Sequence, residues 1–259
     1  AKGNFIQGAA DIHAIVHFAE ELSIPAESSP TGEEIRANPA QIYFFGHSQG
    51  GTTGPVALPF EPGIKGAVLS GAGAGLTLAL LNKTSPVNSP AGLQIALQDP
   101  SIVVGEDRTM RPFANQNHPV LSLIQGYFEE VDTMNYAEHL GARAIDGVTT
   151  PSHVFQTYGL EDTFTPPVGM RALAVAMRAT YLNPQLEDLG TQSVRFADGP
   201  VAANQAPSGD SMTVAGRQYT SDGDYDGHFV AFREAQAIAD WVEFLTTAIV
   251  SGVPSVGTP

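Results

Sequence analysis

A serine flanked by glycines two residues to either side follows a run of apolar residues. The segment Gly46-His47-Ser48-Gln49-Gly50 comes directly after Ile42-Tyr43-Phe44-Phe45. A Gly-x-Ser-x-Gly turn between a strand and a helix holds the serine in a sparsely populated backbone conformation and exposes its hydroxyl above the sheet. The pattern alone could arise by chance in a chain with 27 glycines. The strand-forming residues before it favour a nucleophile, and Ser48 is predicted to attack an acyl carbonyl.

A serine hydroxyl is a poor nucleophile until a histidine accepts its proton. His228 stands in the glycine-bearing loop SDGDYDGHFVAF just before the last predicted helix, and a loop of this kind can bring an imidazole over the edge of a sheet. The alternative is a surface histidine in an acidic loop. The six other histidines are less suitable, because they lie upstream of Ser48, beside it with a side chain expected to point elsewhere, or in or next to a long insertion: His13, His17, His47, His118, His139 and His153.

The histidine in turn needs an acid that fixes its tautomer. The segment Tyr158-Gly159-Leu160-Glu161-Asp162-Thr163 leaves a predicted strand between the serine and the histidine. Asp162 is the predicted acid. Glu161 is the alternative, because one residue of register decides which side chain points inward. Both acids could instead belong to an exposed acidic turn.

These residues need elements that bring them to one edge of a sheet. Strands that alternate with helices predict an α/β fold with a mainly parallel sheet. The elements expected in chain order are a helix over residues 8–22, a polar loop over 25–40, a strand over Gln41–Phe45, a helix after Ser48 that is cut short near Pro55, a strand over Ile64–Ser70, a strand over Ser152–Tyr158, a helix over Pro167–Tyr181, a short strand over Ser193–Ala197, a turn-rich loop over 199–227 and a closing helix over Phe229–Ile249.

Residues 76–141 lack this order. Amphipathic pieces alternate with proline- and asparagine-rich turns, which favours a helical insertion above a sheet core formed by residues 1–75 and 142–259. The apolar side chains of the insertion favour an acyl or aromatic substrate over a sugar, unless they only attach the insertion to the core: Phe113, Leu121, Leu123, Ile124, Tyr127 and Phe128.

The motifs and their order resemble the α/β-hydrolase superfamily. GHSQGG is similar to its nucleophile elbow, GLEDTFTP to its acid loop and DGHF to its histidine loop, and the order Ser48, Asp162, His228 is the one that this fold imposes. Within the superfamily the chain is similar to bacterial secreted lipases and carboxylesterases. The resemblance implies a cap, or lid, over 76–141, a small ester or lipid substrate, and a location outside the cell or in the cell envelope.

The resemblance also exposes a departure. The backbone N–H of Gln49 is predicted to be the first donor of the oxyanion hole, but only 47 residues precede Ser48 and they contain no HG- or HGG-type motif for the second. Losing one such donor costs about 3 kcal/mol of transition-state stabilisation. We therefore expect that earlier strands and the second donor lie upstream of residue 1.

Composition excludes several classes of function. With 27 acidic and 12 basic residues the formal net charge is −15, which disfavours nucleic acid as a partner. The absence of cysteine excludes disulfides, thiolate metal sites and cysteine nucleophiles. No apolar run approaches the roughly 20 residues that span a bilayer. The chain also lacks a P-loop and a dinucleotide-binding G-x-G-x-x-G after a strand, so no cofactor is predicted.

One metal-like pattern needs separate treatment. Asp222, Asp224 and Asp226, followed by Gly227, copy the first half of an EF-hand loop, but position twelve is Arg233. We therefore predict no metal and expect these acids to solvate the loop and stabilise an imidazolium.

The hypothesis that follows from the motifs together is a serine hydrolase of carboxylic esters. The alternatives are a peptidase or amidase on the same scaffold and a non-catalytic binding protein.

Overall fold

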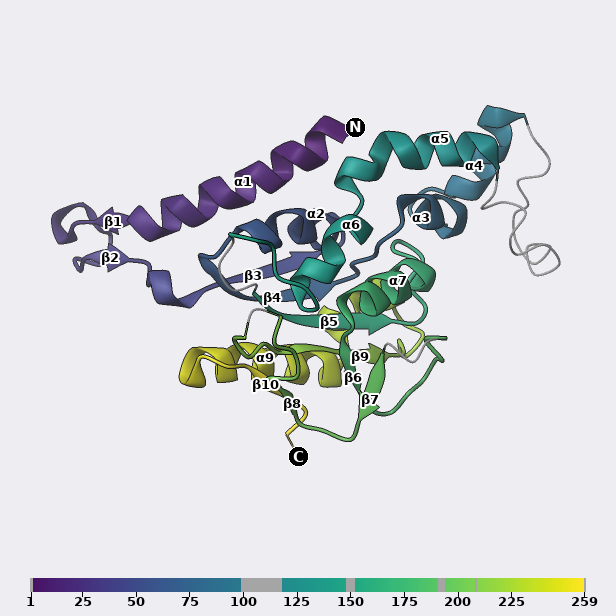
Figure 1. Cartoon of the computed structure of the whole chain (residues 1–259). Helices are drawn as coiled ribbons and strands as arrows, with labels where there is room; N and C mark the ends of the chain where they lie inside the picture. Colours follow the sequence, from purple (N-terminus) through teal and green to yellow (C-terminus); the bar gives the residue numbers. More distant parts are fainter. Residues whose placement is uncertain (1, 99–117, 148–151, 191–193, 208, 259) are drawn as a thin grey trace.

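The central sheet has six described strands in the order β3-β4-β5-β9-β6-β7, and every neighbouring pair is parallel (Figure 1). The computed structural model describes residues 2–98, 118–147, 152–190, 194–207 and 209–258. The strands are β3 (Ile42–His47), β4 (Ile64–Ser70), β5 (His153–Gly159), β9 (Val214–Tyr219), β6 (Thr180–Leu182) and β7 (Arg195–Ala197). The predicted α/β class with a parallel sheet is confirmed.

Helices connect these strands and flank the sheet (Figure 1). They are α1 (Lys2–Glu21), α2 (Gln49–Ala57), α3 (Leu76–Asn82), α4 (Ser89–Leu97), α5 (Pro119–Phe128), α6 (Met134–Ala137), α7 (Pro167–Met177), α8 (Val230–Arg233) and α9 (Ala235–Ser251). Two short antiparallel pairs complete the description: β1 (Ser23–Ile24) with β2 (Ile35–Arg36), and β8 (Val201–Ala202) with β10 (Ser255–Val256).

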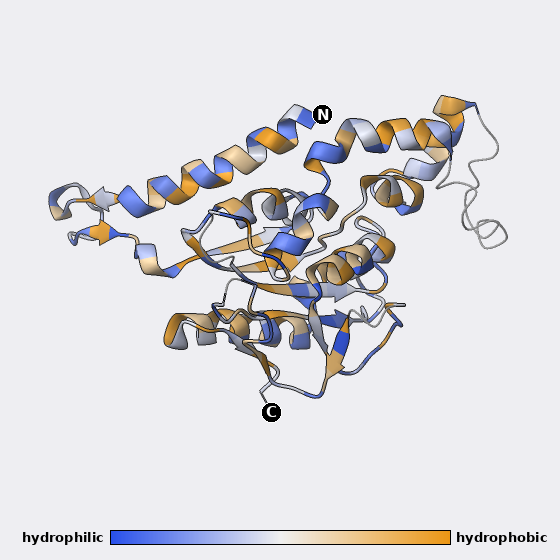
Figure 2. Cartoon of the chain, viewed as in Figure 1, coloured by the Kyte–Doolittle hydropathy of each residue, from blue (hydrophilic) through white to orange (hydrophobic). Residues whose placement is uncertain are grey.

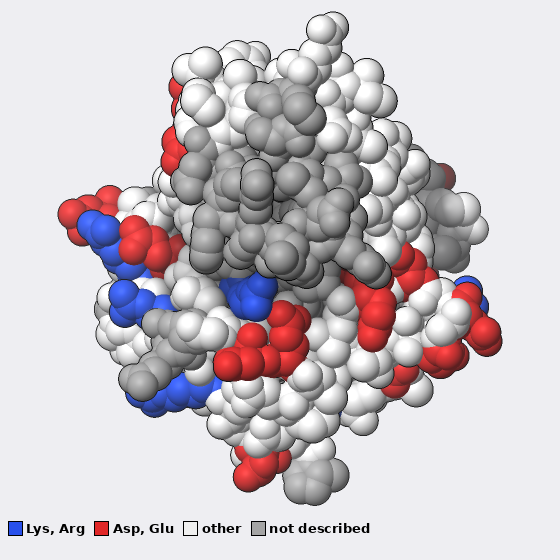
Figure 3. Space-filling model, turned by 90° about the vertical axis from the view of Figure 1, so that its right-hand side faces the viewer, with Lys and Arg blue, Asp and Glu red and all other residues white. Residues whose placement is uncertain are grey.

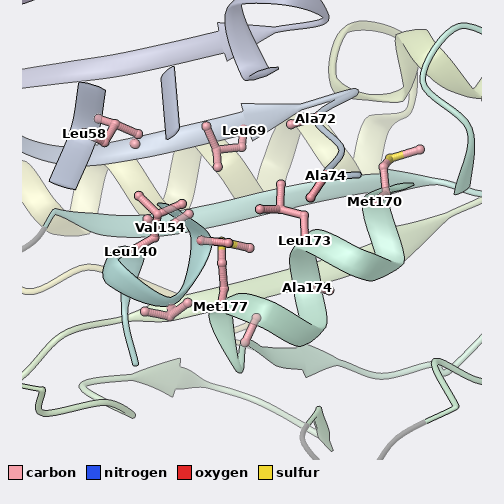
Figure 4. Close-up of a cluster of buried hydrophobic side chains, with 14 of the residues drawn as sticks. Leu58, Leu69, Ala72, Ala74, Leu140, Val154, Met170, Leu173, Ala174 and Met177 are labelled. Carbon is pink, nitrogen blue, oxygen red and sulfur yellow. The ribbon is translucent and has the colours of Figure 1, made fainter. Parts of the chain in front are cut away.

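The core has two layers because successive residues of a strand face opposite sides of the sheet. On one side, Leu69 and Val154 pack against α7, whose Met170, Leu173, Ala174 and Met177 are fully buried (Figure 4). On the other side, Val68 and Phe155 pack against Phe244 of α9. The strands β4 and β5 are therefore apolar on both faces, which is typical of a covered parallel sheet.

Strand β3 forms one edge of the sheet in the described part of the chain, where β4 is its partner. Its residues Ile42, Tyr43, Phe44 and Phe45 are only half-buried, although their composition is that of an inner strand. The described residues before β3 form α1, the β1–β2 pair and short 3-10 turns, none of which joins the central sheet. The expected earlier strands would lie outside this chain and stay a prediction.

The sequence analysis missed two strands of the central sheet, as well as the four short strands of the two antiparallel pairs. The helix predicted over Pro167–Tyr181 ends at Met177, because Arg178 adopts a left-handed conformation (φ 54°), and residues Thr180–Leu182 form β6. The loop predicted over 199–227 contains β9, a strand between β5 and β6 in the middle of the sheet. Of the short strand predicted over Ser193–Ala197, Ser193 lies outside the described residues and the structure gives Arg195–Ala197.

The closing helix predicted over Phe229–Ile249 is divided. The structure places a 3-10 turn at Gly227–Phe229, the short helix α8 over Val230–Arg233, and a break at Glu234 before α9. The side chain of Glu234 accepts a hydrogen bond from the backbone N–H of Gln236 at 3.3 Å and so caps α9. The break matters for the site, because the 3-10 turn carries His228.

The described parts of residues 76–141 form helices and 3-10 turns joined by short loops. Helices α3, α4 and α5 lie beside one another, and much of α4 and α5 is hydrophobic (Figure 2). Leu81 and Leu121 form a small core of their own there. The buried carboxylate of Asp132 attaches this region to the sheet edge by accepting hydrogen bonds from the backbone N–H groups of Gly75 and Leu76, each at 2.8 Å. The start of α3 is thereby fixed.

Candidate active site

Ser48 occupies a strained turn between β3 and α2. Its backbone has φ 57° and ψ −117°, values that non-glycine residues rarely adopt. Its N–H donates to the carbonyl of Ser70 at 2.9 Å, and its own carbonyl accepts from the N–H of Thr52 at 3.0 Å. The first bond attaches the turn to the end of β4, and the second begins the helix. This is the strand–turn–helix context that the sequence predicted.

The glycines around Ser48 have different roles. A Cβ atom at Gly46 would lie 2.8 Å from the carbonyl oxygen of Gly50, and one at Gly51 would lie 2.8 Å from the Cβ of Ala72 and 3.0 Å from the carbonyl oxygen of Ser70. Both positions therefore require glycine for close packing of α2 against the sheet. A Cβ at Gly50 would meet no atom within 4 Å. The steric need for glycine near Ser48 therefore applies to Gly46 and Gly51 and not to Gly50.

Asp162 and His228 form a buried pair. Asp162 follows β5 and His228 follows β9, and these strands are neighbours, so their carboxyl ends meet at one edge of the sheet. The Nδ1 atom of His228 lies 2.8 Å from Oδ2 of Asp162, and the two residues are 2% and 3% exposed. Oδ1 of Asp162 accepts the N–H groups of Phe164 and Thr165 at 2.8 and 2.6 Å. Every oxygen of this carboxylate is thus hydrogen-bonded.

Glu161 is placed elsewhere. Its Oε2 accepts the N–H of Ser221 at 3.1 Å in an exposed position. Its backbone carbonyl accepts the N–H of Gly227 at 3.3 Å. The structure therefore brings Asp162, and not the alternative Glu161, to the histidine.

The imidazole of His228 lies beside the backbone that holds Ser48. A Cβ at Gly71, the residue after Ser70, would lie 2.7 Å from both Cε1 and Nδ1 of His228. Because the N–H of Ser48 is bonded to Ser70, the serine turn and the imidazole both adjoin the end of β4. Gly71 has φ +52°, so glycine is favoured there for its backbone and required for its lack of a side chain.

His47 is a part of the site that the sequence analysis missed. Its side chain was expected to point elsewhere, but its ring centroid lies 4.5 Å from that of His228, and its Nδ1 lies 3.1 Å from the hydroxyl of Ser70. Burial, followed by the neighbouring charge of His228, lowers the pKa of His47 to about 4. His47 is therefore neutral at neutral pH. The feature of the sequence that could have identified His47 is that it directly precedes Ser48.

Aromatic rings fix the orientation of His228. The ring of Phe164 stacks on the imidazole with centroids 4.8 Å apart and planes 14° apart, and Phe229 meets it edge-on at 5.2 Å.

Burial is the main cause that raises the pKa of Asp162, whereas its hydrogen bonds to His228, Thr165 and Phe164 act in the opposite direction. With the carboxylate accepting from Nδ1–H, Nε2 keeps the lone pair that a general base needs.

The aspartates of the EF-hand-like segment are not arranged as calcium ligands. Oδ1 of Asp226 accepts the N–H groups of His228 and Thr163 at 2.8 and 3.1 Å, and its Oδ2 accepts the hydroxyl of Thr163 at 2.5 Å. Asp222 accepts the N–H of Asp224 at the loop surface. Among the described residues, no group of three or more His, Asp or Glu side chains is arranged to hold a metal ion.

A cavity of about 400 Å³ opens beside Ser48. Its described lining is Phe5, Ser48, Gln49, Thr52, Gly73, Ala74, Gly75, Leu76, Ala79, Lys83, Phe164, Thr165, Pro166 and Gly169. Gln49 is the first residue of α2, and the first N–H groups of a helix have no partner within it. The predicted oxyanion donor is therefore on the same helix end as the serine.

The insertion residues predicted to shape an acyl pocket do not line this cavity in the described structure. Leu121 is fully buried against Leu81 with Ile124 beside it, and Leu123 and Tyr127 are exposed. Phe113 lies outside the described residues. The apolar wall comes instead from α1, α3 and the acid loop.

A parallel sheet, a strained serine turn after one strand, and an acid and a histidine after two later neighbouring strands occur here in one arrangement. These are the features that the sequence analysis compared with the α/β-hydrolases, and they lie on a parallel α/β fold of the predicted class.

No protein-family model matches the chain, and no curated protein matches it significantly. Among solved structures it is similar to acetyl xylan esterase 1 from Thermoanaerobacterium sp. JW/SL YS485, with 12% sequence identity and a TM-score of 0.43, over 83% of this chain and 48% of that one. It is also similar to the enol-lactonase from Burkholderia xenovorans LB400, with 18% identity and a TM-score of 0.31, over 80% of this chain and 66% of that one. The chain thus spans about half and just under two thirds of the lengths of these two chains.

Proposed function

We propose that this chain is a serine hydrolase that cleaves carboxylic esters through an acyl-enzyme intermediate. Ser48 is the nucleophile, His228 the general acid and base, and Asp162 the residue that orients His228. The observation that carries the proposal is the buried Asp162–His228 hydrogen bond of 2.8 Å beside Gly71, next to the Ser70 carbonyl that accepts the N–H of Ser48.

In the first half-reaction, the Oγ of Ser48 attacks the carbonyl carbon of the ester while Nε2 of His228 takes its proton. The carbonyl oxygen becomes an oxyanion and accepts a hydrogen bond from the N–H of Gln49, at the positive end of α2. The carboxylate of Asp162 stabilises the imidazolium that forms. The C–O bond then breaks, His228 returns the proton to the leaving alcohol, and the acyl group stays on Ser48.

In the second half-reaction, water repeats the attack. His228 removes a proton from the water, the hydroxide adds to the acyl carbon, and the same N–H of Gln49 stabilises the new oxyanion. Release of the acid restores the Ser48 hydroxyl. The second oxyanion donor expected from the sequence stays a prediction.

The cavity supports a small acyl group. Phe5, Leu76, Ala79, Phe164 and Pro166 give its wall an apolar character, and a space of about 400 Å³ is within the lower range for small-molecule sites. Because Leu76 and Ala79 come from α3 and Lys83 directly follows it, we propose that residues 76–141 act as the cap that shapes this cavity. In the described residues no helix is long and apolar enough to cross a membrane.

The test is covalent labelling with a fluorophosphonate, followed by peptide mass spectrometry. We expect one adduct on Ser48, no adduct in Ser48→Ala, and hydrolysis of p-nitrophenyl acetate and butyrate that is lost in the same variant. An exposed serine such as Ser122, changed to alanine, is the matched control. Labelling that persists in Ser48→Ala would contradict the proposal.

The same assays separate the alternatives that the sequence left open. Faster cleavage of aminoacyl p-nitroanilides than of p-nitrophenyl esters would indicate a peptidase or amidase. Absence of labelling and of hydrolysis of either substrate class would indicate a binding protein with this fold.

A further inference from the structure

Lys83 contributes the only charge to the described lining of the cavity beside Ser48. We infer that Lys83 forms an anion subsite, so that the preferred substrate is an ester whose acyl part carries a second, ionised carboxylate. This inference rests on the proposed function and specifies its substrate class.

The position of Lys83 is fixed by its backbone. Its N–H donates to the carbonyl of Ala79 at 2.8 Å at the end of α3, and its carbonyl accepts the N–H of Ser89 at 3.0 Å. The next two residues, Thr84 and Ser85, both donate their N–H groups to the carbonyl of Thr163, each at 3.0 Å. Because Thr163 directly follows Asp162, Lys83 is held beside the acid loop of the site.

Within the described residues the ammonium group of Lys83 has no acidic partner. Its closest recorded interaction is with the ring of Phe164, whose centroid lies 6.0 Å from Nζ. The two carboxylates near the cavity are already engaged: Asp132 by the N–H groups of Gly75 and Leu76, and Asp162 by His228 and the acid loop. The positive charge is therefore available to a ligand.

The net negative charge of the chain makes the position of Lys83 important for binding an anionic substrate. The formal net charge is −15, so the general field of the protein repels anions. Figure 3 looks at the right-hand side of the molecule as seen in Figure 1, and its described part shows both acidic and basic side chains on this face. A cation that lines the cavity offsets the general repulsion at that place.

Size sets the form of the substrate. Ser48 and Lys83 line one cavity of about 400 Å³, so the ester carbonyl and the anionic group must belong to one small molecule. Half-esters of short dicarboxylic acids have this form: one carboxyl is the ester that Ser48 attacks, and the other is the carboxylate that Lys83 binds. A partly exposed ion pair of this kind changes affinity by up to about fivefold.

The experiment compares two esters of equal length. p-Nitrophenyl hydrogen adipate carries the free carboxylate, and p-nitrophenyl methyl adipate replaces it with a neutral ester. We expect the ratio of kcat/KM for the charged over the neutral ester to fall about fivefold in Lys83→Met, to be restored in Lys83→Arg, and to decrease with salt in the wild type. Lys65→Met, at the start of β4, is the control and should leave the ratio unchanged. An unchanged ratio in Lys83→Met would overturn the inference.

A binding measurement separates this inference from the proposed function. In the Ser48→Ala background, calorimetric titration with p-nitrophenyl hydrogen adipate should show binding that weakens about fivefold in Lys83→Met. Hydrolysis of the neutral ester with no effect of Lys83 in either assay would refute the subsite and leave the hydrolase proposal standing. Binding that depends on Lys83, without hydrolysis of either ester by the wild type, would refute the hydrolase proposal and keep the subsite.

Discussion

Asp226 is joined to Thr163 by two hydrogen bonds, one from the N–H of Thr163 at 3.1 Å and one from its hydroxyl at 2.5 Å. Thr163 directly follows the acid of the site, and Asp226 lies two residues before its histidine. The same carboxylate also accepts the N–H of His228. Asp226 therefore connects the loop after β5 to the loop after β9 and sets the distance across which Asp162 and His228 meet.

Removing this connection should affect stability and activity together. We expect Asp226→Ala to lower the free energy of unfolding by about 1–2 kcal/mol, as the loss of a capping carboxylate does, and to reduce kcat/KM about tenfold because His228 is held less precisely. Asp224→Ala, at an exposed position of the same loop, should stay within about 0.5 kcal/mol of the wild type. Urea unfolding and ester hydrolysis measure both quantities.

The Asp226 variant also tests the calcium pattern. Because both carboxylate oxygens of Asp226 are engaged by Thr163 and His228, calcium should not change the melting temperature of the wild type relative to EDTA. A stabilisation by calcium that disappears in Asp226→Ala would show that the loop binds the ion after all.

A methyl group at Gly71 should displace the imidazole. Its Cβ would lie 2.7 Å from Cε1 and Nδ1 of His228, far inside van der Waals contact, and the φ of +52° costs a non-glycine residue about 1–2 kcal/mol. We expect Gly71→Ala to keep the fold by circular dichroism and to lower kcat/KM at least about 100-fold. Gly92→Ala in α4 is the matched control, because a Cβ there meets nothing within 4 Å. Equal activity of the two variants would contradict the described packing.

His47 should make the protein less stable in mild acid. Its pKa is lowered to about 4 in the folded chain, whereas in the unfolded chain an ordinary histidine has a pKa of about 6.5. Between these values the unfolded state binds more protons, so this contribution to stability is complete above about pH 6.5 and is lost as the pH falls toward 4. His47→Gln removes the titration.

The measurement is the free energy of unfolding in urea at several pH values between 4 and 7. The slope of the unfolding free energy against pH should be smaller in His47→Gln than in the wild type. The difference corresponds to up to about one proton taken up on unfolding. A side-chain nitrogen NMR titration of the wild type gives the pKa directly. Parallel pH profiles of the two proteins would show that His47 titrates normally.

The sequence predicted the elements whose residues have one clear pattern. The strand Ile64–Ser70 was placed at its observed bounds, because an apolar run between a turn and a glycine-rich loop favours one structure. The turn at Ser48 was predicted for the same reason, since the glycines and the preceding strand agree. Figure 4 shows Met170, Leu173 and Met177 of α7, which recur at helical spacing in the sequence, in the buried cluster.

The missed strands had patterns that fit another structure equally well. Tyr181 continues the helical spacing of Met170, Leu173, Ala174 and Met177, so only the left-handed turn at Arg178, which depends on tertiary packing, ends the helix. In β9 the sequence VAGRQY contains a glycine and a half-buried arginine. Arg217 is accommodated there because both oxygens of the buried Asp240 accept from it at 2.9 and 2.8 Å. The residues next to Arg217 in sequence do not indicate that its partner is Asp240, which lies 23 residues away.

The choice between the two adjacent acids is the sharpest test of the site. Asp162→Asn keeps the shape of the side chain but removes the charge that holds Nδ1–H of His228 and stabilises the imidazolium. By analogy with other serine hydrolases, kcat should fall about 10³- to 10⁴-fold. Glu161→Gln should stay within about threefold, because Glu161 contacts Ser221 and not His228.

A structural effect of Asp162→Asn is separated from a catalytic one by two readouts. The downfield proton resonance of Nδ1–H in His228 should be present in Glu161→Gln and lost in Asp162→Asn. Fluorophosphonate labelling of Ser48 should slow in the same variant, while its urea midpoint shows how much of the chain stays folded. A larger loss of kcat in Glu161→Gln than in Asp162→Asn would mean that the acid loop shifts by one residue in the working enzyme and that the hydrogen bond of 2.8 Å is not the catalytic one.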